Sequence, residues 1–294
     1  MRWRGRRESS NIEDMRGQGS TGRRGLRMPG SGGGGGKLGI IGTIVVVLAG
    51  LYFGVDPSVF LGGGGAPQAP AHTVDTSSPE ARDSRAFVAT VLADTEDTWH
   101  RIFGLMGRSY EEPKLVLFSG SVQSACGFAQ SATGPFYCPG DQKVYLDTSF
   151  FDELGSRFGA PGDFAQAYVI AHEIGHHVQT LLGISRQVAS LRAQASQREG
   201  NALSVRQELQ ADCFAGIWAY HARRSRDLLE AGDIDEALTA ATAIGDDRLQ
   251  KQAQGHVVPD AFTHGSSAQR VRWFRQGMQT GTMDACDTFN AREL

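Results

Sequence analysis

The residues His172-Glu173-Ile174-Gly175-His176 decide how the rest of this 294-residue chain is interpreted. Two histidines four positions apart lie one turn above each other on an α-helix, so both rings can reach one metal ion from the same side. Glu173 lies between them, where it can take a proton from a water at that ion. This H-E-x-x-H spacing is typical of a zinc site that activates water for hydrolysis.

The residues around the motif favour a helix. Pro161-Gly162-Asp163 followed by Gln166 predicts a turn and a capping box, and Gly183 predicts the end of the helix. The two motif histidines border an apolar stripe, whereas His177 projects about 120° away from them and is expected to be structural or solvated. The stripe consists of Phe164, Ala167, Ala171, Ile174, Gly175, Val178 and Leu182.

A catalytic zinc site also needs a third protein ligand and an open position for water. The best candidate is Glu208, which lies with Asp212 beside the inward stripe of a second predicted helix. A carboxylate next to a core is costly unless a metal ion or a histidine N–H compensates it. We therefore predict Glu208 as the third ligand and Asp212 as the acceptor that orients a ligand imidazole; two ordinary surface acids are the alternative. Four small residues should let this helix approach the histidine helix closely: Ala211, Ala215, Gly216 and Ala219.

The combination of H-E-x-x-H with a downstream E-x-x-x-D resembles the gluzincin metallopeptidases, in which two histidines and one glutamate hold zinc. Longer stretches resemble the bacterial putative neutral zinc metallopeptidase family over nearly the whole chain. They are Arg2-Trp3-Arg4-Gly5-Arg6-Arg7-Glu8-Ser9-Ser10, Gly134-Pro135-Phe136-Tyr137-Cys138-Pro139 and His264-Gly265-Ser266-Ser267-Ala268-Gln269-Arg270. The resemblance implies a zincin-like α+β domain, mostly helical, with a small sheet before the active-site helix.

These residues predict a peptidase in which Zn²⁺ is held by His172, His176 and Glu208, and Glu173 is the general base. A tetrahedral oxyanion needs a hydrogen-bond donor opposite the metal. The resemblance points to His264, with His256 and Tyr168 as weaker candidates. Arg270 is a candidate partner for an active-site carboxylate. The expected substrate is a peptide or protein, although another amide such as a cell-wall crosslink stays open. The alternative function is a catalytically inactive, metal-binding scaffold or adaptor tethered to a membrane.

The charge distribution separates the amino terminus from the rest of the chain. Residues 1–37 contain nine Arg or Lys and three Asp or Glu, a net charge of +6, whereas the remainder has a net charge of −9. We expect residues 1–37 to be a disordered, basic, cytoplasmic segment. Residues 56–79 are expected to be a linker rich in Gly, Ala and Pro, and residues 80–294 the zinc metallopeptidase domain.

Residues 38–55 are eighteen residues without a charge, which is just long enough to cross a bilayer as one transmembrane helix. The positive charge before this run predicts a single-pass protein of the cell (inner) membrane, with its amino terminus in the cytoplasm and its catalytic domain outside. A cleaved signal peptide is the alternative, but its candidate site, Ala69-Pro70-Ala71, lies too far beyond the apolar run.

Four cysteines fit an exported domain. Cys126 and Cys138 could close a short loop, which would leave Cys213 to pair with Cys286, although four cysteines allow three connectivities. Cysteine ligation of zinc is disfavoured because the chain has no C-x-x-C spacing. No nucleic-acid partner is expected. A nucleotide or phosphate site is not indicated either, since the glycine runs at 32–36 and 62–65 lack the strand and helix of a phosphate loop.

The remaining elements follow from periodicity. Helices are predicted at residues 82–103, from Asp233 onward, and from Ser266 to near Gly277. Strands are predicted at residues 114–118, 134–138 and 143–146. Residues 125–129 are either an edge strand that aligns substrate or an ordinary hairpin held by its disulfide.

Overall fold

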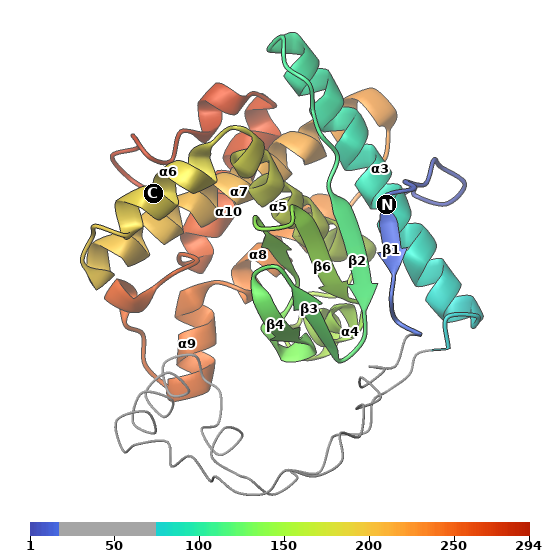
Figure 1. Cartoon of the computed structure of the whole chain (residues 1–294), viewed down its shortest axis with the longest axis horizontal. Helices are drawn as coiled ribbons and strands as arrows, with labels where there is room; N and C mark the ends of the chain where they lie inside the picture. Colours follow the sequence, from blue (N-terminus) through green and yellow to red (C-terminus); the bar gives the residue numbers. More distant parts are fainter. Residues whose placement is uncertain (18–74) are drawn as a thin grey trace, which may run out of the picture. The chain divides into compact units, whose positions relative to one another are not determined.

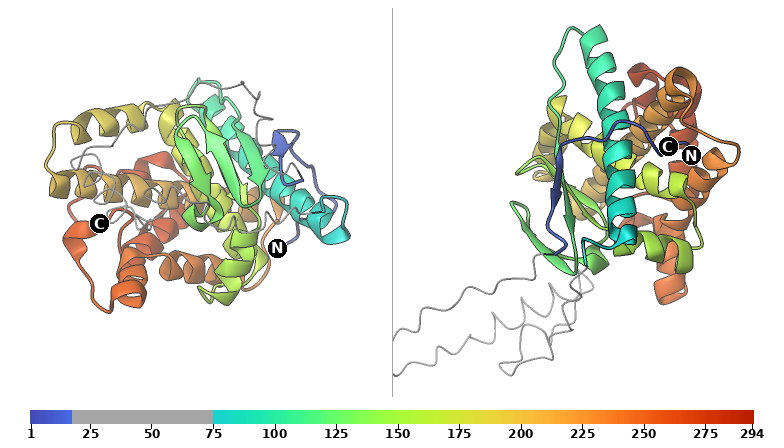
Figure 2. Two further views of the ribbon diagram at one scale, coloured as in Figure 1. Left: turned by 60° about the horizontal axis from the view of Figure 1, so that its bottom comes forward. Right: turned by 90° about the vertical axis from the view of Figure 1, so that its right-hand side faces the viewer.

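A four-stranded sheet and a two-stranded hairpin lie against a larger set of helices in the computed structural model, which describes residues 1–17 and 75–294. The strands gather in one layer, and most of the helices lie to one side of it (Figures 1 and 2). The predicted fold class, α+β and mostly helical with a small sheet before the motif helix, is confirmed.

The sheet has the strand order β1-β2-β6-β5. Its members are β1 (Ile12–Asp14), β2 (Lys114–Phe118), β5 (Phe136–Cys138) and β6 (Lys143–Asp147). Strands β1, β2 and β6 are parallel, and β5 runs antiparallel to β6. Leu115 and Leu117 of β2 enter the main core, whereas Val116 and Phe118 enter a second cluster. Strand β2 is therefore covered on both faces, which explains its continuous apolar sequence.

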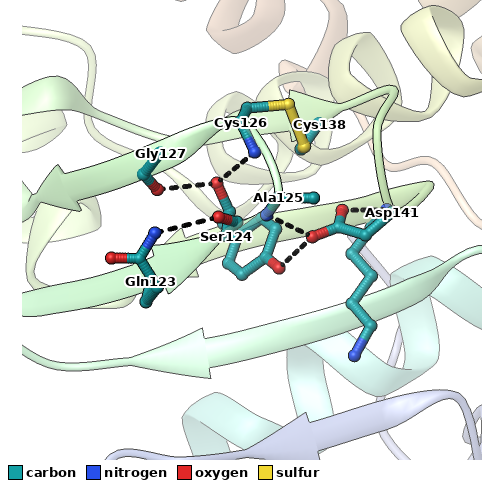
Figure 3. The surroundings of a disulfide bond; sticks show 9 residues. Gln123, Ser124, Ala125, Cys126, Gly127, Cys138 and Asp141 are labelled. Atoms are coloured by element: carbon teal, nitrogen blue, oxygen red, sulfur yellow. Dashed lines mark hydrogen bonds between the residues drawn. A yellow bond between two sulfur atoms is a disulfide. The ribbon is translucent and has the colours of Figure 1, made fainter.

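The hairpin of β3 (Ser121–Ser124) and β4 (Gly127–Gln130) is fixed to the sheet at its turn. A disulfide joins Cys126 of the turn to Cys138 of β5, and the Asp141 carboxylate accepts the Ala125 N–H at 2.9 Å and the Tyr145 hydroxyl at 2.7 Å (Figure 3). Residues 125–129 thus form the turn and most of the second strand, β4, of a hairpin separate from the main sheet. The second predicted pairing, Cys213 with Cys286, is confirmed as well.

Helix α5, which carries the motif, is surrounded by α3, α7, α8 and the sheet. The α-helices are α3 (Pro79–Leu105), α4 (Ser149–Ser156), α5 (Asp163–Leu181), α6 (Ile184–Arg192), α7 (Gln197–Arg226), α8 (Asp233–Ala243), α9 (Asp246–Gln254) and α10 (Ser267–Thr280). Short 3₁₀ turns lie at Ser131–Thr133, Pro259–Ala261 and Met283–Cys286. Ser78 caps α3 through its side chain, and Ser266 with Gln269 forms the predicted capping box of α10.

Glycines set the distances of α7 from its two main neighbours. A Cβ on Gly175 of α5 would lie 3.0 Å from the Ala211 backbone, so α5 and α7 are in close contact beside the motif. Gly216 was expected to serve the same interface, but it faces α10, where an added Cβ would lie 2.1 Å from the Phe274 carbonyl. The prediction that the last helix ends near Gly277 is also wrong. Gly277 lies inside α10, and the position requires glycine because an added Cβ would lie 1.9 Å from the Cys213 carbonyl of α7.

The start of α5 differs from the predicted capping box. Gly162 is the N-cap residue and supplies no side chain; the Glu236 carboxylate of α8 instead accepts the Phe164 N–H at 3.0 Å. Asp163 binds the amino group of Met1 at 2.8 Å. A tertiary contact therefore replaces the local cap. The predicted end is confirmed, since Gly183 follows α5 with a φ of 82°.

Residues 1–17 are part of the domain, so the prediction of a disordered segment is wrong for them. Strand β1 pairs with β2, and Met1 and Trp3 are buried in the main core. The transmembrane run at residues 38–55 lies outside the described residues, as does most of the predicted linker. Within the described part of the chain, no helix has both the length and the apolar character needed to cross a bilayer.

Candidate metal centre

Helices α5 and α7 bring three potential ligands to one point. The ligand atoms of His172, His176 and Glu208 lie within 4.8 Å of one another. His172 Nε2 is 3.2 Å from one Glu208 oxygen, and His176 Nε2 is 3.4 Å from the other. Tetrahedral zinc with bonds of about 2.0–2.1 Å separates its ligand atoms by about 3.4 Å. The spacing and the donor types of these three side chains therefore fit a zinc ion.

Both imidazoles are oriented through their other ring nitrogen. His172 Nδ1 lies 2.8 Å from an Asp212 carboxylate oxygen, and His176 Nδ1 lies 2.9 Å from the Gln179 side-chain oxygen. Since both partners are acceptors, each ring donates from Nδ1 and keeps the Nε2 lone pair for a metal. Gln179 is itself held, because its amide group donates to the Gln207 carbonyl at 2.7 Å and to the Gln210 side chain at 3.1 Å.

Asp212 is fully buried and is surrounded by donors. Arg270 of α10 donates to both of its oxygens at 2.9 Å, and the Tyr168 hydroxyl donates to one of them at 2.5 Å. Burial alone would raise the pKa of Asp212, but Arg270 and His172 lower it to about 2. The carboxylate is therefore ionised when it accepts from His172. This geometry also removes Tyr168 as a candidate for the oxyanion, because its hydroxyl faces Asp212 in the interior.

Glu173 lies one position after the first ligand and is only 8% exposed. Burial raises the pKa of its carboxyl group, while the neighbouring His172 and His176 lower it, and the net shift is upward. A raised pKa brings a carboxylate closer to the value at which it can both take and release a proton near neutral pH.

His264 belongs to the loop before α10 and is held by Asp246, the first residue of α9. One Asp246 oxygen accepts the backbone N–H groups of Thr263, His264 and Gly265 at 2.7, 2.6 and 3.1 Å, and the other lies 3.2 Å from His264 Nδ1. Burial lowers the pKa of His264, but the bond to Asp246 and the charge of Glu208 outweigh it and raise the pKa overall. The ring of His264 is half exposed.

Two other histidines lie elsewhere. His256 is exposed, and its ring meets the carbonyl of Gln254 two residues away. His177 is 1% exposed and faces Tyr137 and the Glu111 carbonyl, on a different side of α5 from the two ligands. Of the two expectations for His177, structural or solvated, the structure supports the structural one.

The sequence interpretation missed two residues that support the site. Gln179 lies one turn beyond His176, a spacing that could have indicated a partner for that ring. Asp246 gave no comparable signal, since eighteen positions separate it from His264 and only the fold of the loop brings them together.

Two imidazoles and one carboxylate that converge beside a buried glutamate could hold one metal ion, as the donors of a two-histidine, one-glutamate site do. Residues 1–289 match the family described as "Putative neutral zinc metallopeptidase", and the chain belongs to this family. It is 51% identical to the uncharacterized protein YpfJ of Escherichia coli (strain K12), across 98% of this chain and 99% of that protein. It is 42% identical to the uncharacterized protein Rv2575 of Mycobacterium tuberculosis (strain H37Rv), across 83% and 86%. No solved structure matches the chain.

Proposed function

We propose that this protein is a zinc-dependent peptidase that hydrolyses peptide bonds in peptides or proteins. The observation that carries the proposal is the convergence of His172 Nε2, His176 Nε2 and the Glu208 carboxylate, with Glu173 buried next to them. Zinc bound there supplies a Lewis acid for the scissile carbonyl and activates water for attack near neutral pH.

The side chains of the site have distinct tasks in this reaction. Glu173 accepts the proton of the attacking water and passes it to the leaving amine, which requires the intermediate proton affinity that its burial favours. His264, oriented by Asp246, donates a hydrogen bond to the oxyanion. Asp212 and Gln179 fix the tautomers of the two ligand imidazoles.

The sheet supports a polypeptide as substrate. Strand β5 is the last strand in the order β1-β2-β6-β5, so no strand of the described residues pairs with its outer edge. It also packs against α5, the helix that carries the motif. An extended peptide could pair with such an edge through its backbone, with little demand on its side chains. In this proposal, β5 and not residues 125–129 is therefore the edge strand that aligns the substrate. The two disulfides support an oxidising compartment and hence an exported substrate.

A metal-binding scaffold without turnover is the competing function, and replacement of Glu173 separates the two. Purified Glu173→Gln protein should keep one zinc per chain, measured by elemental mass spectrometry. It should lose cleavage of a peptide library by about 10²-fold or more, because a general base contributes about 10²–10⁴-fold. Glu293→Gln is the matched control, since Glu293 is 86% exposed and belongs to the carboxyl-terminal segment. This variant should retain both its zinc and its peptide cleavage. No cleavage by the unmodified protein would favour the scaffold, whereas full turnover in Glu173→Gln would remove Glu173 from the proposed mechanism.

A further inference from the structure

Residues 1–17 form an integral part of the domain that carries the metal centre. Strand β1 extends the sheet at the outer edge of β2, with Ile12 opposite Leu115 and Asp14 opposite Leu117 (Figure 1). Trp3 is 9% exposed and its ring packs edge-on against Phe87 of α3, with ring centroids 5.4 Å apart. Removing this segment would uncover part of the main core and the edge of the sheet.

The arginines of this segment are paired with acidic residues of the same domain. Arg2 contacts Asp227, and Arg4 contacts Asp83. Arg7 meets Asp97 at 2.7 Å and the buried Glu96 at 3.2 Å. These positive charges contributed to the expectation that the amino terminus stays in the cytoplasm. In the fold, they hold the segment on the domain.

The end of the amino-terminal segment lies beside the start of α3. Arg16, near the end of this segment, is 2% exposed and donates to the Ala81 carbonyl in the first turns of α3 at 3.0 Å. The two described segments, which lie before and after the apolar run at residues 38–55 in the sequence, therefore belong to one folded unit.

We propose that residues 1–17 and residues 75–294 lie on the same side of any membrane that this protein meets. A run of eighteen residues can cross a bilayer once, and one crossing would place β1 and β2 on opposite sides. The pairing of β1 with β2 thus excludes the single-pass topology expected from the sequence. The disulfides identify that shared side as the exported one. This inference does not depend on the peptidase proposal.

A native ion pair gives a direct test of the packing. Lys143 Nζ of β6 lies 2.7 Å from a Glu13 carboxylate oxygen of β1, close enough for a carbodiimide to join them as an amide. The full-length protein, in the cell fraction where it is found, should yield a peptide that links residue 13 to residue 143 by mass spectrometry. Lys143→Arg keeps the charge but removes the amine, so this link should be lost. Absence of the link in the unmodified protein would overturn the proposal.

Cysteine labelling tests the topology separately. Ser10→Cys and Ser190→Cys place single thiols at two exposed positions, one in the amino-terminal segment and one on α6. In intact spheroplasts, a membrane-impermeant maleimide should label both to the same extent. Labelling of one thiol with protection of the other until detergent is added would overturn the proposal. Protection of both thiols would agree with the claim that the two segments lie on the same side, but it would contradict the claim that this side is the exterior.

Discussion

Arg270 and Asp212 face each other in the interior through two hydrogen bonds of 2.9 Å, one to each carboxylate oxygen. Both side chains are almost completely buried, at 3% and 0% exposure. One oxygen of Asp212 also accepts from His172 at 2.8 Å, so the ion pair lies directly behind a metal ligand. The arginine thereby couples α10 to the metal centre on α5 and α7.

Replacing Arg270 by Met should destabilise the protein and weaken its metal site. The substitution leaves Asp212 buried without its cation, which costs about 3–5 kcal/mol. Loss of a partner behind a ligand weakens metal binding about 10–100-fold. Urea unfolding of the metal-free protein and a competitive zinc titration measure the two effects. The double variant Arg270→Met, Asp212→Asn should recover much of the stability but not the zinc affinity. Additive losses in stability would show that the two residues do not act as a pair.

Replacing Asp246 by Asn should reduce turnover without affecting the metal. The amide can still accept the backbone N–H groups of the loop, but it lacks the negative charge that stabilises the His264 imidazolium, the form in which the ring donates from Nδ1 to Asp246 and from Nε2 to the oxyanion. Loss of one oxyanion donor costs about 10²–10³-fold in kcat. Peptide hydrolysis should fall by this factor with unchanged zinc content. Asp247→Asn is the matched control, since Asp247 binds Ser267, and it should hydrolyse peptides at the normal rate. An equal loss in both variants would remove His264 from the proposed chemistry.

Replacing Gly175 by Ala should lower zinc affinity through the backbone of α7. The added Cβ would lie 3.0 Å from the Ala211 backbone, and α7 must shift to relieve this contact. Glu208 lies one turn before Ala211 on the same helix, so the shift moves the third ligand relative to the histidines. A zinc titration measures the loss. Gly104→Ala is the control, because an added Cβ there meets nothing within 4 Å; its zinc affinity should be unchanged. Unchanged affinity in Gly175→Ala would mean that the helices can separate without moving the ligand.

The core of the candidate site could be predicted because its information is local. Helical spacing places His172 and His176 on one side of a helix, and the same spacing places Glu208 and Asp212 on one side of a second helix. Helix boundaries set by side chains in other elements could not be read in this way. Gly277 resembles a helix stop in the sequence, but it lies inside α10. The position is a glycine because the Cys213 carbonyl of α7 leaves no room for a Cβ. Glu236 caps α5 from a distance of 72 positions along the chain.

The amino-terminal segment shows the same limit in another form. Its arginines and glycines have the composition of a disordered segment, and composition carries no information about a partner elsewhere in the chain. Asp83, Glu96 and Asp227 supply that partner surface, and Trp3 adds an apolar contact with Phe87. The segment is therefore ordered by tertiary contacts that its own residues do not reveal.

His177 should make the stability of the domain depend on pH in the acidic range. Its ring donates from Nε2 to the Glu111 carbonyl at 2.6 Å and lies 3.1 Å from the Tyr137 hydroxyl. Burial lowers its pKa to about 4, compared with about 6.5 in the unfolded chain. Between these values the unfolded state binds a proton that the folded state does not. The free energy of unfolding therefore falls by up to about 3 kcal/mol as the pH drops from about 6.5 to 4. His177→Gln removes this titrating group. The difference in unfolding free energy between the unmodified protein and the variant should therefore shrink as the pH drops from about 6.5 to 4. Urea unfolding of the metal-free proteins at several pH values measures the difference, and a constant difference would show that His177 titrates alike in both states.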